Sequence, residues 1–150
     1  MKLKFKKHYI RQHSFEKERY NRDKQIIVKY GLRNKKEIGK YLFLLKKYRS
    51  IQVQKDEGTI TLTNYNKVID KLTKNEILQE GKNILDLTIE DFLQRRLQTI
   101  VYELGFGKTL LHARQLITHK HINVNGEVCI RPSRIINKKD LIVSRDNLGE

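Results

Sequence analysis

The sequence predicts an α+β protein: a basic helical N-terminal half, residues 1–87, followed by a small module of two helices, a β-hairpin and a further short strand, residues 88–150. Three observations support this division. The first half carries apolar residues at helical spacing among an excess of lysine and arginine. Two later segments each begin with a threonine that can cap a helix. Beyond residue 121 the pattern changes to the alternation of apolar and polar residues that is typical of strands.

The first segments are strongly basic. Residues 1–14 show no sustained apolar period, which predicts an extended arm. Ser14 offers an N-cap for a helix that should run to about Lys29. Gly31 follows, and glycine readily adopts the left-handed conformation that ends many helices. The chain is therefore expected to turn sharply at this point.

A second helix is predicted over residues 35–50. Asn34 can accept a hydrogen bond as its N-cap, and Glu37 stands three residues later, as in a capping box. Apolar residues at helical spacing form the stripe that should be buried: Ile38, Tyr41, Leu42, Leu45 and Tyr48. The cations on the other faces fit a solvated surface and an RNA-facing surface about equally well.

Residues 51–66 are weakly patterned. Residues 56–58 indicate a turn, and residues 59–63 alternate threonine with isoleucine and leucine, which predicts a short strand. A short helix is expected over residues 65–74, where apolar residues return to helical spacing.

The C-terminal module begins with two predicted helices. Thr88 can cap the first, with Asp91 at the third helical position, and the apolar stripe continues to Leu104. Gly105 should end this single long helix. Thr109 can cap the second helix, which follows a Gly-Phe-Gly turn.

A β-hairpin should follow the helices. Asn125 and Gly126 stand between two alternating runs, and this pair favours a type I′ turn, in which both central residues have positive φ. Pro132 closes the hairpin, and residues 141–143 predict the last strand.

Charge restricts the classes of partner. The 150 residues include 32 Lys+Arg and 17 Asp+Glu, a formal net charge of +15. Such a charge repels itself in a compact chain unless a polyanion neutralises it, which favours a nucleic-acid partner. No apolar run reaches the length of a transmembrane helix, and the first residues lack the apolar stretch of a secretory signal. A cytosolic protein is therefore expected.

No convincing catalytic, metal or cofactor site is visible. Glu90 and Asp91 are explained as charges that favour a helix start. Cys129 is the one cysteine, which excludes an internal disulfide and a multi-cysteine zinc site and suggests a small apolar residue in a strand. The histidines lack a cysteine or carboxylate cluster: His112, His119 and His121. Residues 105–109 resemble the end of a P-loop but lack its leading glycine and do not follow a strand. We expect no enzyme, no metal and no cofactor.

Basic side chains gather around the helix pair and the turn that follows it: Arg95, Arg96, Arg114, His119, Lys120 and His121. Guanidinium groups match phosphate oxygens in bidentate pairs, and polar side chains can complement ribose hydroxyls. These residues are compatible with an RNA-binding face, and a merely solvated basic face is the alternative.

Residues 88–102 and 113–126 resemble the RNA-binding domain of the ribosomal protein S-four family. The sequence Arg-Arg-Leu-Gln-Thr at residues 95–99 is similar to that of the archaeal and eukaryotic branch of the family, called S-nine in eukaryotes. Residues 15–19 and 30–37 are similar to the opening segments of that branch. The resemblance covers about residues 14–48 and 84–143.

The resemblance implies a structural constituent of the cytoplasmic small ribosomal subunit. It implies binding to the 5′ domain of small-subunit rRNA during assembly, contacts with neighbouring ribosomal proteins and a share in the mRNA entry region. The matching RNA-facing positions are Arg95, Arg96, Arg114, Gln115, His119, Lys120 and His121, with Asn125 and Gly126 shaping the hairpin and Arg33, Lys35 and Lys36 in the N-terminal segment. The alternatives are an accessory module of an RNA-modifying enzyme and a free RNA-binding regulator.

Overall fold

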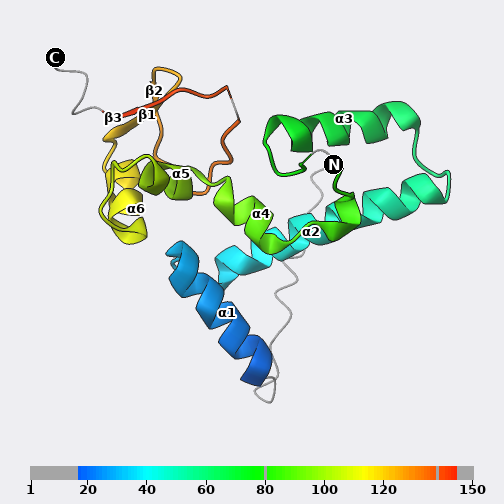
Figure 1. The fold of residues 1–150 in the computed structure, drawn as a ribbon, viewed down its shortest axis with the longest axis horizontal. Coiled ribbons are helices and arrows are strands. Elements are labelled where there is room, and N and C mark those ends of the chain that lie inside the picture. The colour runs from blue at the N-terminus through cyan, green and yellow to red at the C-terminus, as the bar shows by residue number, and fades with distance from the viewer. Residues whose placement is uncertain (1–16, 80, 138, 145–150) are drawn as a thin grey trace, which may run out of the picture.

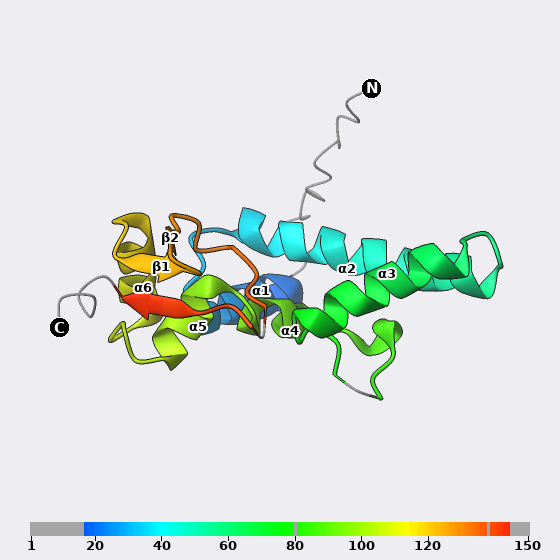
Figure 2. The ribbon, with the colours of Figure 1, turned by 90° about the horizontal axis from the view of Figure 1, so that it is seen from above.

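The protein is mostly helical, with one small sheet, as a computed structural model shows (Figure 1). The structure describes residues 17–79, 81–137 and 139–144. The predicted arm over residues 1–14, with the Ser14 cap, lies outside these ranges. Helices α2 and α3 lie side by side at one end, and the sheet lies with α5 and α6 at the other (Figures 1 and 2). The predicted α+β class is confirmed.

Helix α1, Lys17–Tyr30, ends as the sequence predicts. Gly31 has a φ of 57°, and the Leu32 amide returns to the Ile27 carbonyl at 3.0 Å, which closes a Schellman turn. Helix α2, Lys35–Asp56, then begins at the predicted cap, because the Asn34 side chain accepts a hydrogen bond from the Glu37 amide at 3.3 Å.

The segment after α2 differs from the prediction. Helix α2 runs on to Asp56, and the strand expected over residues 59–63 is wrong, because a turn there leads into α3, Leu62–Lys74. The Thr59 amide and hydroxyl both donate to the Gln54 carbonyl, at 2.9 Å each. These local bonds take the groups that a strand would need for its pairing.

The single helix predicted from Thr88 to Leu104 is two helices, α4 (Ile89–Gln94) and α5 (Leu97–Glu103). The predicted capping box of Thr88 is present at the start of α4. At the break, Arg96 forms an isolated β-bridge with Ile135. The Leu97 amide donates to the Arg134 carbonyl at 2.8 Å, so a segment far along the chain satisfies the open start of α5.

The remaining predicted elements follow in order, and one short helix was not predicted. The short 3-10 helix η1, Ile84–Asp86, precedes α4, and α6, Leu110–Thr118, begins at Thr109, whose hydroxyl oxygen accepts a hydrogen bond from the His112 amide at 3.1 Å. The three strands, β1 (Ile122–Val124), β2 (Glu127–Val128) and β3 (Ile142–Ser144), form an antiparallel sheet in the order β2-β1-β3.

The hairpin prediction is confirmed. Asn123 pairs with Val128 across the turn, and Asn125 and Gly126 have φ angles of 55° and 83°. Both central residues therefore have the positive φ that a type I′ turn requires. Strand β3 covers the other edge of β1, and this places all three residues of β1 in the interior.

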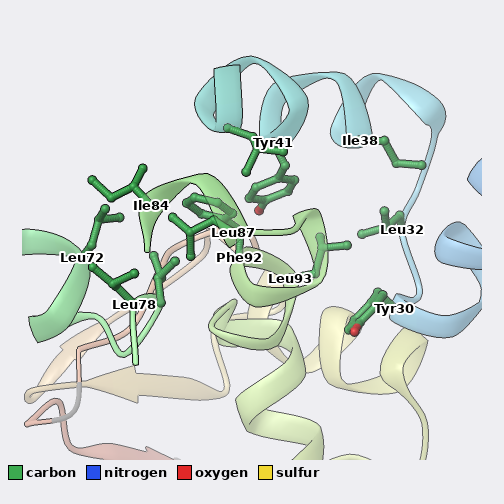
Figure 3. Close-up of a cluster of buried hydrophobic side chains, with 12 residues drawn as sticks. Tyr30, Leu32, Ile38, Tyr41, Leu72, Leu78, Ile84, Leu87, Phe92 and Leu93 are labelled. Atoms are coloured by element: carbon green, nitrogen blue, oxygen red, sulfur yellow. The ribbon is translucent and has the colours of Figure 1, made fainter. Parts of the chain in front are cut away.

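Two clusters of buried apolar side chains lie on either side of the α4–α5 break. The first joins α2, α3, η1 and α4 and includes Tyr30 and Leu32 (Figure 3). The ring of Tyr48 packs against this cluster and stacks on Phe92, with centroids 5.9 Å apart. The second joins α5 and α6 to the sheet and includes Cys129, which is buried there. In the described ranges no helix is both long and apolar enough to cross a membrane.

Candidate nucleic-acid interface

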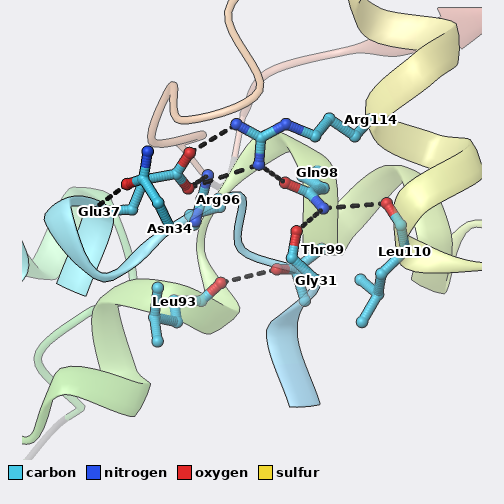
Figure 4. A network of polar contacts seen from close by, with 9 residues as sticks. All are labelled: Gly31, Asn34, Glu37, Leu93, Arg96, Gln98, Thr99, Leu110 and Arg114. Carbon is cyan, nitrogen blue, oxygen red and sulfur yellow. Dashed lines mark hydrogen bonds and ion pairs between the residues drawn. The ribbon is translucent and has the colours of Figure 1, made fainter. Parts of the chain in front are cut away.

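A partly buried carboxylate joins the N-terminal helices to the C-terminal module (Figure 4). Glu37, in the first turn of α2, accepts a hydrogen bond from Arg114 Nη2 at 2.6 Å and from Arg96 Nη2 at 3.0 Å. Arg114 belongs to α6, and Arg96 lies at the α4–α5 break. One side chain of α2 therefore ties together two segments that lie 59 and 77 residues away.

The amide of Gln98 extends this network. Its Nε2 donates to the carbonyls of Gly31 and Leu110, at 2.9 Å each, and its Oε1 accepts from Arg114 Nη1 at 3.3 Å. Gly31 must lack a side chain here, because a Cβ would lie 2.8 Å from the Cβ of Leu110. The α1–α2 turn thus packs directly against the start of α6.

The environment keeps Glu37 ionised. Burial by itself would raise the pKa of Glu37, but the hydrogen bond from Arg114 and the charge of Arg96 outweigh burial and hold the pKa below its ordinary value. Arg96 is fully buried, and its guanidinium lies 5.6 Å from the ring centroid of Tyr41. The two remaining nitrogens of Arg96 have no hydrogen-bond partner, so Glu37 supplies its only described ion pair.

The three arginines of the C-terminal module that are predicted to face RNA are paired with carboxylates of the fold. Arg96 and Arg114 share Glu37, and Arg95 pairs with Glu76 at 2.8 Å. Burial leaves Arg96 no surface for a ligand in this structure, because its side chain is packed beneath α2. Arg95 and Arg114 keep part of their side chains exposed. Sequence spacing does not signal these pairs, because the acidic partners come from other elements.

Six predicted positions are open to solvent on the described surface: Arg33, Lys36, Gln115, His119, Lys120 and Asn125. Two others are half-buried. Lys35 places its ammonium 3.8 Å from the ring centroid of Tyr20, and His121 lies in the turn after α6. The exposed side chain of Asn125 donates to Asp140 at 2.8 Å and accepts from the Leu141 amide at 2.8 Å, so it fastens the hairpin to β3.

The end of α6 presents Lys120 in a constrained turn. The Lys120 amide donates to the Ile117 carbonyl at 3.1 Å, and the His121 amide donates to the Leu116 carbonyl at 3.0 Å. This is a Schellman turn with lysine in the position that glycine usually takes, and the φ of Lys120 is 68°. The turn therefore holds the backbone of Lys120 in one conformation and presents its cationic side chain next to the C-terminus of α6.

The P-loop-like segment and His112 make structural contacts within the fold. Residues 105–109 form the turn between α5 and α6, where a Cβ on Gly107 would lie 2.9 Å from the Ala113 nitrogen. Gly107 therefore allows close packing of the turn on α6. His112 Nδ1 accepts a hydrogen bond from the Lys108 amide at 3.1 Å. Across the part of the chain that the structure describes, no group of three or more metal-ligating side chains gathers.

Known proteins resemble this chain along most of its length. Residues 95–142 match the S4 domain. The chain is 34% identical over 145 residues to small ribosomal subunit protein uS4 of Picrophilus torridus, with 91% of this chain and 79% of that protein covered. It is 37% identical over 148 residues to small ribosomal subunit protein uS4 of Thermoplasma acidophilum, with 93% and 74% covered.

Proposed function

The chain belongs to the family of small ribosomal subunit protein uS4, and from this premise we propose that it is a structural constituent of the small ribosomal subunit that binds small-subunit rRNA. Family membership agrees with the resemblance that the sequence carries at residues 88–102 and 113–126. The S4 domain, matched over residues 95–142, supplies the RNA-binding module.

One observation carries the proposed mode of binding. The ion pair between Glu37 and Arg114 joins the start of α2 to α6, the two elements on which exposed predicted residues are concentrated. Arg33 and Lys36 flank the first turn of α2, and Gln115 lies on α6. The buried network thus holds both basic segments in a fixed relation, so RNA meets a preorganised surface.

Two kinds of contact divide the work in this mechanism. Exposed cations neutralise phosphates and release counterions, which supplies affinity that depends on salt and little on sequence. The fixed helix pair and the Lys120 turn match the shape of folded RNA, where side chains meet phosphates and 2′-hydroxyls. Arg95 and Arg96 contribute indirectly, because their pairs hold the α4–α5 break in place.

We also propose the finer assignment that the family resemblance implies. The target is the 5′ domain of small-subunit rRNA, bound during assembly in the cytoplasm. The chain contacts neighbouring small-subunit proteins and takes part in lining the mRNA entry region. The division into residues 1–87 and residues 88–150 is part of the same proposal. The two apolar clusters meet near the α4–α5 break, so α4 packs with the N-terminal cluster although it lies beyond residue 87.

A salt series with paired variants tests the binding mode. The logarithm of the affinity for a 5′-domain rRNA fragment should fall linearly with the logarithm of salt. The double variant Lys36→Ala, Lys120→Ala should reduce that slope by about 1 for each lost phosphate contact. Lys67→Ala, Lys71→Ala removes the same charge from α3 and serves as the matched control, because both lysines are exposed there. Equal slopes for both variants would refute the assigned face.

Sedimentation separates the alternatives. A ribosomal constituent should comigrate stoichiometrically with small subunits on a sucrose gradient, whereas a free regulator should remain near the top. An accessory module of an RNA-modifying enzyme is disfavoured, because the chain matches most of the length of two relatives, and both are named as ribosomal proteins. A chain that is absent from purified small subunits would contradict the proposal.

A further inference from the structure

Two arginines outside the predicted set stand at the ends of one tight turn. The Arg134 amide donates to the Arg131 carbonyl at 3.1 Å, which closes a β-turn with Pro132 at its second position. Such a turn brings its first and last Cα atoms within about 7 Å. Both arginines are exposed, so two positive charges project from neighbouring points of the surface.

The turn is anchored to the core and not free to drift. The Pro132 carbonyl accepts from the Gln98 amide at 3.2 Å, and the Arg134 carbonyl accepts from the Leu97 amide at 2.8 Å. Both amides belong to the first turn of α5, which is fully buried at these residues. The arginines are therefore presented by a rigid backbone, which lowers the entropic cost of holding a ligand.

A shallow hollow of about 490 Å³ opens beside the turn. It is lined by Val128, Cys129, Ile130, Arg131, Ser133 and Arg134. Val128 is 44% exposed and Ile130 is 53% exposed, so apolar surface lies next to both guanidinium groups and a hydroxyl. The lining of the hollow thus combines cationic and apolar side chains.

The local charge favours an anion. Within the described residues, neither guanidinium forms an ion pair, and Arg134 Nη1 has the Cys129 sulfur at 4.0 Å as a weak acceptor. Asp140 feels the charge of Arg134, but its carboxylate already accepts from Asn125 Nδ2 at 2.8 Å and from the Asn137 amide at 3.0 Å. Two like charges on neighbouring residues of one turn are stabilised when an outside anion lies between them.

We propose that this hollow binds one unpaired nucleotide of RNA, with its phosphate on Arg131 and Arg134 and its base against Val128 and Ile130. The inference rests on the proposed function and names a contact outside the residues predicted to bind RNA. An unpaired nucleotide combines a phosphate with an exposed base; a guanidinium can bind the phosphate or stack on the base, and apolar side chains can exclude water from the other part of the base face. Ser133 can meet a phosphate oxygen or the 2′-hydroxyl.

Binding of a short single strand to the full chain tests the site. The probe is an oligouridylate of about ten nucleotides, with duplex RNA of the same length as comparison. Arg131→Ala, Arg134→Ala should weaken oligouridylate binding at least about tenfold and duplex binding much less. The matched variant Lys67→Ala, Lys71→Ala removes two charges from another exposed surface and should cost both probes only a small factor. Equal losses in the two variants would overturn the proposal.

Two further measurements locate the site, and a third separates a failure of this inference from a failure of the proposed function. An oligouridylate that carries 4-thiouridine should cross-link to the peptide containing residues 128–134, and this cross-link should vanish in the double arginine variant. Polyglutamate at equal ionic strength should not compete; full competition would assign the hollow to an acidic protein segment instead. Binding of the 5′-domain fragment is measured in parallel, so a chain that binds that fragment but shows no oligouridylate effect refutes this inference alone.

Discussion

Replacing Glu37 by glutamine removes the negative charge of a partly buried side chain and leaves its size nearly unchanged. In the native protein the Glu37 carboxylate faces two guanidinium groups, at 2.6 Å for Arg114 and 3.0 Å for Arg96. Arg96 has no solvent exposure and no other described ion pair. The variant therefore leaves a fully buried positive charge without compensation.

The expected loss of unfolding free energy is about 3–5 kcal/mol, the range observed when one partner of a buried ion pair is removed. This is a large part of the total for a domain, which is about 5–15 kcal/mol. With a urea m-value of about 2 kcal/mol/M, the midpoint should fall by about 1.5–2.5 M. Equilibrium urea unfolding followed by circular dichroism measures the shift.

Glu90→Gln is the matched control. Glu90 accepts from Lys29 Nζ at 2.6 Å and from the Tyr30 hydroxyl at 2.9 Å, but 42% of its side chain is exposed. Solvent and salt screen such a pair, so the midpoint should move far less. Comparable midpoints for the two variants would refute the reasoning. The double variant Glu37→Leu, Arg96→Met should recover part of the loss, because it removes the fully buried guanidinium together with its partner and leaves only the partly exposed Arg114 without its carboxylate.

Acid should erase the difference between the wild type and Glu37→Gln. The pKa of Glu37 in the folded protein lies below its ordinary value of 4.5. Its contribution to stability is therefore fully present above that value and is lost as pH falls through the folded pKa. Urea midpoints of the two proteins should converge as pH falls from neutral through the folded pKa of Glu37, and a constant gap at all pH values would show that the charge of Glu37 is not the cause.

Two further substitutions test backbone geometry. Lys120→Gly should raise the unfolding free energy by about 0.5–1 kcal/mol, because a φ of 68° suits glycine, while it weakens rRNA binding; urea unfolding and filter binding measure the two effects, and a loss of stability would contradict the assigned turn. Gly31→Ala should cost at least about 2 kcal/mol in urea unfolding, because its φ is 57° and the new Cβ would lie 2.8 Å from Leu110 Cβ. Gly39→Ala is the control. It should stabilise the chain by about 0.5–1 kcal/mol, because Gly39 lies inside α2 and its new Cβ meets nothing within 4 Å. Similar effects of the two alanines would count against the close contact between the α1–α2 turn and α6.

Local signals in the sequence predicted the boundaries that depend on neighbouring residues. The Asn34 cap, the Thr88 capping box and the Thr109 cap all form with partners three residues away. The Asn125–Gly126 turn likewise follows from the φ that two adjacent residues can adopt. Propensity and side-chain chemistry are sufficient in these cases because each hydrogen bond closes within one turn of chain.

The candidate site was only partly predictable. The sequence indicated which cations gather near the helix pair, and the family comparison supports an RNA-binding role for the module. It did not show that Arg96 is buried or that Arg95 and Arg114 are paired within the fold. The sequence also did not single out Arg131 and Arg134. The proposed site depends on the hollow beside their turn, which residues 128–130 line and which exists only in the folded chain.

Sequence alone determined the class of fold, the excess of positive charge and the places where most helices begin. The tertiary structure decided that the chain breaks between α4 and α5, because only folding brings the carbonyls of Pro132 and Arg134 to the open amides of α5. It also decided which arginines face solvent, because Glu37 and Glu76 reach them from distant segments. Pairing across such distances depends on where packing places the elements, and no local spacing encodes it.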